Sequence, residues 1–185
     1  LPALPLISEL NTLPDAQFLA AVNLLFETAP PLAQRLLARR PYTSYEELIS
    51  VAEAIVLDDS RADSGHATAL TDEEVLQVVN AHPRIGAPAT ALSTLSQREQ
   101  GGGGGRTGDA DPVALAKTLE QLAELNAAYE AKYGFRFIVF VNGRSRAEIV
   151  PVLEERLAHG RRDEEIRTAL EAMIAIARDR LNKMQ

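Results

Sequence analysis

The sequence predicts an all-α protein, a single-domain bundle of about eight helices over residues 1–185 with one extended link near 135–142. Aromatic residues make up 5% of the chain and Trp is absent, so the core is expected to consist mainly of Leu, Ile, Val and Ala. Three segments carry capping boxes, which mark the starts of helices. Apolar residues recur at helical spacing along most of the chain.

Four helices are expected in the N-terminal half of the chain. Residues 1–11 contain two prolines and are expected to cover the surface as a non-helical segment. Pro14 suits the first turn of a helix, whereas Pro30-Pro31 interrupts the chain. Capping boxes begin at Ser44 and Thr71, with a polar loop over 58–70 between their helices. The expected helices cover about 14–28, 32–40, 44–57 and 71–80.

Four further helices are expected in the C-terminal half. Asp111-Pro112 begins the longest of them, and Gly134 is suited to end it. The segment 135–141 is rich in β-forming residues, but no second strand is available for pairing, so we expect an extended or irregular buried link. The run Gly101–Gly105 ends regular structure and indicates a flexible connector. The expected helices cover about 93–100, 111–133, 145–158 and 164–183.

Composition excludes several classes of function. The formal net charge of −7 argues against nucleic-acid binding, which requires a concentrated basic face. The absence of Cys removes disulfides, thiolate nucleophiles and Cys-based metal sites, and it suits a cytoplasmic protein. The three histidines lack the spacing of metal ligands, so no metal site is predicted. No stretch approaches the ~20 apolar residues that a membrane span requires, so no membrane association is expected.

His82 is the strongest single candidate for a catalytic group. It lies at the predicted exit of a helix, Pro83 restricts its backbone, and the turn 84–86 follows. A turn residue or a semi-buried histidine with a local hydrogen bond would explain the same pattern, so both interpretations stay open. His66 lies in a polar loop and His159 at a helix end, where solvation and the helix dipole explain them.

The run from Ser96 to Gln100 is the second candidate. In a helix, Ser96, Glu99 and Gln100 share one face because they are three and four residues apart. A hydroxyl, a carboxylate and an amide together suit the recognition of a small polar heterocycle with N–H and C=O groups. An exposed polar helix face is the alternative interpretation.

Six segments occur in a recognisable order over nearly the whole chain. They are 10–14 with Phe18; 82–86; 96–100; 125–129 with 133–137; 143–149; and 176–177 with 180–181. This pattern resembles the OHCU decarboxylase family, named for 2-oxo-4-hydroxy-4-carboxy-5-ureidoimidazoline. The resemblance implies an all-α fold, a homodimer, and decarboxylation of this substrate to (S)-allantoin in urate (purine) breakdown, without a metal or an organic cofactor.

The resemblance also implies the residues of the site. His82 matches the family's proton donor, and Glu99 and Arg180 are further catalytic candidates. The positions that match substrate contacts are Pro83, Ser96, Gln97, Arg98, Glu99, Gln100, Phe137, Ile138, Val139, Phe140 and Val141. This chain departs from the family pattern in the Gly101–Gly105 run, which raises the question of a lid, in the long 58–70 loop, and at Asn142, where many relatives have Arg.

The implied chemistry agrees with these residue types. Loss of CO2 leaves an electron pair that the conjugated ring of the substrate can accept, which accounts for the lack of a cofactor. A histidine with a pKa near neutrality suits protonation of one face of the ring, and unpaired main-chain groups of the link would bind ring and ureido amides. Arg180 would attract the substrate carboxylate or hold Glu99 in place. Two other classes stay open: a non-catalytic helical ligand-binding or sensor domain for a purine catabolite, and a structural interaction module.

Overall fold

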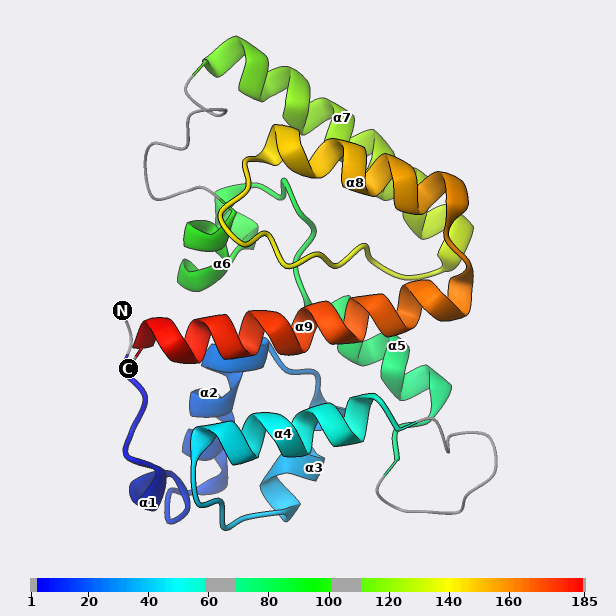
Figure 1. Cartoon of the computed structure of the whole chain (residues 1–185). Coiled ribbons are helices and arrows are strands. Elements are labelled where there is room, and N and C mark those ends of the chain that lie inside the picture. The colour runs from blue at the N-terminus through cyan, green and yellow to red at the C-terminus, as the bar shows by residue number, and fades with distance from the viewer. Residues whose placement is uncertain (1–2, 59–68, 101–110, 185) are drawn as a thin grey trace. The chain divides into compact units, whose positions relative to one another are not determined.

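The computed structural model describes residues 3–58, 69–100 and 111–184 (Figure 1). Within these ranges the chain forms nine α-helices and a short 3₁₀ helix, η2 (Ala89–Ala91), and no strand. The expectation of an all-α fold is therefore confirmed. The Gly101–Gly105 run, His66 and most of the 58–70 loop lie outside the described residues.

By its internal contacts the chain divides into two compact units, 1–82 with 170–185 and 83–169. That the chain forms a single domain stays a prediction.

The first unit is built around α3, which contacts α2, α4 and α5 (Figure 1). Each helix buries an apolar face, for example Phe18 and Val22 on α2 and Leu48 and Ala52 on α4. The last helix adds buried side chains from Leu170 onward. The helices of this unit are α1 (Ile7–Leu10), α2 (Asp15–Phe26), α3 (Pro30–Ala38), α4 (Tyr45–Val56), α5 (Asp72–Ala81) and the second part of α9 (Arg162–Met184).

Two expectations for the N-terminal region are wrong. Residues 7–10 form the helical turn α1 inside the segment expected to be non-helical, and Leu10 is fully buried. Pro30 and Pro31 occupy the first turn of α3, two residues before its expected start. Proline is tolerated there because the first N–H groups of a helix have no partner within it. The chain break that the prolines indicate lies at residues 27–29, where Glu27 adopts a left-handed backbone conformation with φ 50°.

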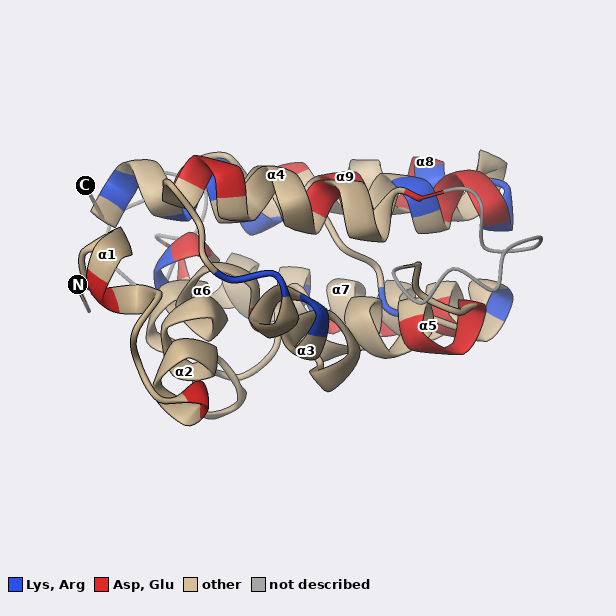
Figure 2. Cartoon of the chain, turned by 90° about the horizontal axis from the view of Figure 1, so that it is seen from below, with Lys and Arg blue, Asp and Glu red and all other residues tan. Residues whose placement is uncertain are grey.

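The predicted capping residues begin their helices. Thr71 and Ser145 form complete capping boxes with Glu74 and Glu148. Ser44 accepts a hydrogen bond from the Glu47 N–H, but the Glu47 carboxylate accepts from Thr43, one residue earlier than a box requires. Figure 2 shows the acidic residues of α5 in red at its first turn, where they complement the helix dipole.

The second unit contains the short helix α6 (Thr94–Glu99), α7 (Pro112–Tyr133), α8 (Arg146–His159) and the start of α9. In it, α7 and α8 lie side by side (Figure 1). Asp111 caps α7 and Gly134 ends it with φ 83°, both as predicted. Tyr129 on α7 packs against Phe135 and Phe137, with ring centroids 5.8 and 5.3 Å apart. These contacts bury the beginning of the extended link against α7.

The segment 135–141 is an irregular link, as predicted, and it ends in a tight turn. Asn142 and Gly143 both have left-handed backbones, with φ values of 47° and 79°. Asn tolerates this conformation better than most residues do, which gives a local reason for Asn142 in this turn. Among the described residues, no helix is both long and apolar enough to cross a membrane.

Gly86 is expected to be harder to replace than Gly143, although both have the same left-handed backbone. Its φ is +79°, and an added Cβ would lie 3.2 Å from Leu122 Cδ1. Gly143 has the same φ but no atom within 4 Å of such a Cβ. Gly143→Ala should therefore lower the free energy of unfolding by about 1 kcal/mol through backbone strain, and Gly86→Ala by about 2 kcal/mol because overpacking is added. Urea unfolding of both variants tests this, and equal losses would contradict the role of Leu122.

Candidate active site

His82 lies at the C-terminal end of α5, as predicted. Its backbone is extended, with φ −70° and ψ 141°, because the following Pro83 disfavours the helical region. The side chain turns inward and the residue is only 3% exposed. The structure therefore excludes the interpretation of His82 as a solvated turn residue. His82 is a buried imidazole at a helix end.

Two other helices of the first unit place charged groups beside His82. Glu27 follows α2, and its Oε2 lies 3.9 Å from His82 Nδ1. Arg180 on α9 is 2% exposed, and its Nη2 lies 3.4 Å from Glu27 Oε1. Arg180 also donates to the carbonyls of Leu24 and Leu25 in the last turn of α2, where a cation complements the helix dipole. Glu27 thus lies between the two predicted catalytic residues of this unit.

The surroundings of His82 set its charge. The net pKa of His82 is lowered from 6.5 to about 4, mainly by burial and also by the Arg180 guanidinium. The Glu27 carboxylate and a hydrogen bond with the Phe26 backbone oppose these effects. His82 is therefore neutral at pH 7, which differs from the near-neutral pKa that the implied chemistry suggested. A neutral imidazole accepts a proton before it donates one.

This lowered pKa predicts acid-sensitive stability. Because the unfolded chain binds a proton at His82 below about pH 6.5 and the folded chain does so only near pH 4, stability falls as the pH falls between these values. From pH 7 to pH 4.5 the free energy of unfolding should decrease by about 2–3 kcal/mol from this group. Above pH 4.5, Glu47, Glu74 and Glu148 contribute little slope, since their pKa values are lowered. Urea titrations should show the loss in the wild type, and an equal loss in His82→Asn would contradict it.

The predicted Ser96–Gln100 run lies on α6 in the second unit. Ser96 and Gln100 are buried, Gln97 and Glu99 are half-buried, and Arg98 is exposed. The Gln100 side chain donates to the Arg84 carbonyl at 3.2 Å and accepts from the Gly86 N–H at 2.9 Å. Its amide therefore holds the turn that follows Pro83. Gln97 donates to the Leu92 carbonyl at 3.2 Å.

The predicted contact residues of the link also lie in the second unit. Phe137, Ile138 and Val141 are buried, whereas Val139 and Phe140 are half-buried. The expectation that the link's main-chain groups are unpaired is wrong for three carbonyls, because arginine side chains bind them. Arg156 donates to the Ile138 carbonyl at 2.9 Å, and Arg144 donates to the carbonyls of Phe140 and Val141 at 2.6 and 3.0 Å.

A buried network positions this link, and sequence reasoning missed it. Glu165 at the start of α9 is 5% exposed, accepts from Tyr129 Oη at 2.5 Å, and pairs with Arg156 Nε at 2.7 Å. The Arg156 guanidinium also lies 4.6 Å from the ring centroid of Phe137. Burial and the hydrogen bond to Glu165 raise the pKa of Tyr129 above its usual range, so it stays a hydrogen-bond donor. Tyr129 lies 27 positions before Arg156 and 36 before Glu165, and no local motif joins the three residues.

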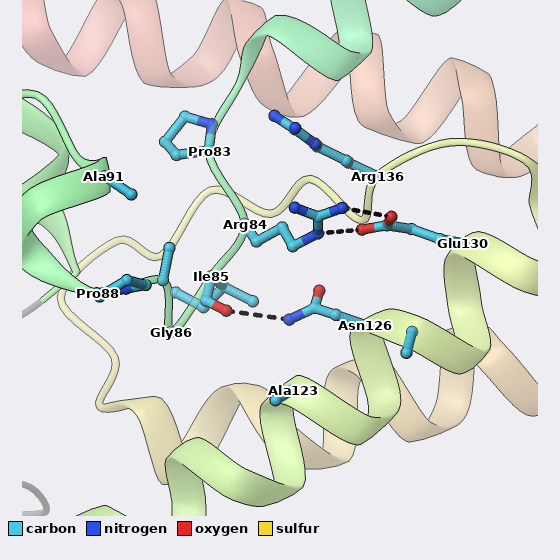
Figure 3. Close-up of a pocket in the computed structure, with 12 residues that line it drawn as sticks. Pro83, Arg84, Ile85, Gly86, Pro88, Ala91, Ala123, Asn126, Glu130 and Arg136 are labelled. Carbon is cyan, nitrogen blue, oxygen red and sulfur yellow. Dashed lines mark hydrogen bonds and ion pairs between the residues drawn. The ribbon is translucent and has the colours of Figure 1, made fainter.

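A cavity of about 490 Å³ lies beside Pro83 in the second unit (Figure 3). The Arg84–Glu130 ion pair, with a Nε–Oε1 distance of 2.5 Å, lies along it. Asn126 donates to the Ile85 carbonyl at 3.0 Å, so α7 also holds the turn after Pro83. Among the predicted substrate contacts in the described ranges, Pro83 alone lines this cavity.

These features define an all-α protein. One unit holds a buried imidazole, carboxylate and guanidinium, and the other holds a polar helix and a link whose carbonyls are bound by arginines. The chain belongs to the OHCU decarboxylase family, whose model matches residues 11–182. The resemblance inferred from the sequence is therefore confirmed.

Individual relatives agree with this assignment. The chain is 30% identical to a 2-oxo-4-hydroxy-4-carboxy-5-ureidoimidazoline decarboxylase of Haloferax volcanii, over 95% of this chain and 93% of that protein. It is 28% identical to a uric acid degradation bifunctional protein of a Bacillus species, over 96% of this chain and 32% of that protein. A crystal structure of OHCU decarboxylase in the presence of (S)-allantoin shares the fold, with a TM-score of 0.62, 23% identity, and coverage of 88% of this chain and 94% of that one.

Proposed function

We propose that this chain is a carboxy-lyase that converts OHCU to (S)-allantoin in urate breakdown. Family membership over residues 11–182 supports the reaction. The structural observation that carries the proposal is the buried His82 beside Glu27 and Arg180. A buried imidazole that is not solvated and lies beside charged partners is typical of a proton-transfer site.

The chemistry of the substrate sets what the protein must do. One ring carbon carries the hydroxyl and the carboxylate, and its neighbour carries the ureido group and the ring C=N bond. When CO2 leaves, the electron pair of the broken bond forms a C=C bond between these carbons, and the C=N electrons pass to the ring nitrogen, which takes up a proton. The hydroxyl then loses its proton to become a carbonyl, and the ureido-bearing carbon gains a proton on one face. The ring is itself the electron acceptor, so the proposed reaction uses neither a metal nor an organic cofactor.

His82 is proposed to carry the proton in the last step. A neutral imidazole accepts the proton of the hydroxyl and delivers it to one face of the ureido-bearing carbon, which makes a single enantiomer. Its lowered pKa favours the neutral form that this step begins with. Glu99 is proposed to orient His82 or bind the substrate hydroxyl, and Arg180 to supply positive charge for the carboxylate.

The remaining proposed contacts come from α6 and the link. Since arginines bind three carbonyls of the link, we assign its N–H groups, rather than those carbonyls, to the C=O groups of the substrate. The resemblance supports contacts from Pro83, from Ser96, Gln97, Arg98, Glu99 and Gln100, and from Phe137, Ile138, Val139, Phe140 and Val141. It also supports a cytoplasmic homodimer that acts on a small molecule and does not bind nucleic acid.

An assay of product chirality tests the proposal. Because OHCU also decays without an enzyme, loss of substrate alone is insufficient, and the optical activity of the allantoin must be followed. The protein should accelerate the appearance of the (S)-enantiomer over the uncatalysed decay. Binding of allantoin without turnover of OHCU would instead support a sensor domain. Thermal unfolding that no purine catabolite alters would support a structural interaction module.

A further inference from the structure

We infer that Glu27 is a positioning residue that sets the orientation and the charge state of His82 during the reaction. The inference rests on the proposed decarboxylation at His82 and adds a residue that sequence reasoning did not identify. Glu27 reaches His82 from the end of a different helix, 55 positions earlier in the chain. Its role would be exerted through the imidazole and not by contact with the substrate.

The Glu27 carboxylate lies between the His82 imidazole and the Arg180 guanidinium. The Glu27 side chain is 11% exposed, that of His82 is 4% exposed and that of Arg180 is 2% exposed. One carboxylate oxygen faces His82 Nδ1 at 3.9 Å and the other faces Arg180 Nη2 at 3.4 Å. Because water is largely excluded, the charge of Glu27 acts on both groups more strongly than it would at the surface.

This arrangement assigns different roles to the two imidazole nitrogens. Nδ1 faces Glu27, and the ring also makes a hydrogen bond with the Phe26 backbone. Nε2 is on the opposite side of the ring, and we assign it to proton exchange with the substrate. When His82 takes up a proton, the Glu27 carboxylate stabilises the imidazolium against burial and against Arg180, the two effects that oppose it.

The backbone of Glu27 provides an independent observation. Its φ of 50° is left-handed, a conformation that glycine adopts without strain and that is uncommon for other residues. Strained backbone of this kind is found preferentially at functional sites. The same feature supplies a test variant, because Glu27→Gly removes the carboxylate and suits the local backbone. Loss of function in that variant would not be a consequence of local backbone strain.

The test compares Glu27→Gln and Glu27→Gly with the wild type in two measurements. In the chiral assay, kcat should fall about tenfold or more in both variants, while KM stays within about twofold because the substrate is not contacted. NMR titration of His82 should show a lower pKa in Glu27→Gln, since the stabilising charge is lost while burial and Arg180 remain. A merely structural role predicts the opposite, a rise toward 6.5, because loosened packing would admit water.

Glu53→Gln is the matched control. Glu53 also pairs with an arginine of α9, Arg178, at 2.5 Å, but 35% of its side chain is exposed. This variant should keep wild-type kcat and the wild-type His82 titration. Wild-type kcat and an unchanged His82 pKa in both Glu27 variants would overturn the inference. If the wild type forms no optically active allantoin, the proposed function fails, and the NMR titration still decides whether Glu27 controls His82.

Discussion

Replacing His82 with glutamine is expected to lower kcat/KM for (S)-allantoin formation by a factor of about 10³. Glutamine is polar and similar in size, but its amide cannot accept and release a proton near neutral pH. OHCU would still lose CO2 slowly without the enzyme, and the product would be racemic. The measurement is the optical activity of allantoin as a function of time, together with total substrate loss.

His159→Gln is the control for this experiment. His159 is 74% exposed in its side chain and pairs with Glu155 at 3.1 Å on the surface of α8. The His159→Gln variant should keep full activity, which would show that loss of a histidine does not by itself lower the rate of (S)-allantoin formation. Stereoselective turnover at the wild-type rate in His82→Gln would exclude His82 as the proton carrier.

Replacing Glu165 with alanine is expected to lower the free energy of unfolding by about 3–5 kcal/mol, the usual cost of removing one partner from a buried ion pair. The variant would leave the Arg156 guanidinium without its carboxylate and Tyr129 Oη without its acceptor in a site where Glu165 is 5% exposed. The link would loosen as well, since Arg156 also holds the Ile138 carbonyl.

Urea unfolding monitored by circular dichroism measures this effect. Glu155→Ala on α8 is a suitable control because its carboxylate side chain is 72% exposed, and exposed pairs contribute about 0–1 kcal/mol. A loss below about 1 kcal/mol in Glu165→Ala would mean that the buried network is not coupled to the stability of the protein.

The helices could be predicted because their signals are local. Thr71, Ser145 and Asp111 begin helices through contacts with residues two or three positions later, and Gly134 ends one through its own backbone. The turn α1 could not be predicted in this way, since four residues carry no periodicity and burial of Leu10 stabilises it. The start of α3 was also hard to predict, because a proline pair such as Pro30 and Pro31 can either interrupt a chain or begin a helix.

The candidate site was predictable only in part. His82 has a local signature, a helix end followed by proline, and the structure confirms its position. Glu27 has none, because its partner Arg180 lies 153 positions away and packing alone brings the two together. The same holds for Tyr129 and Glu165, which are 36 positions apart. Sequence patterns identify residues that act within one element, whereas partners from different elements become visible only in the fold.

The proposed function depends on one spatial claim, that the His82 imidazole contacts the substrate. A crystal structure of the protein grown with (S)-allantoin tests it most directly. We predict a single ligand within hydrogen-bond distance of the His82 imidazole. A ligand bound away from His82 would contradict the proposed role of the imidazole.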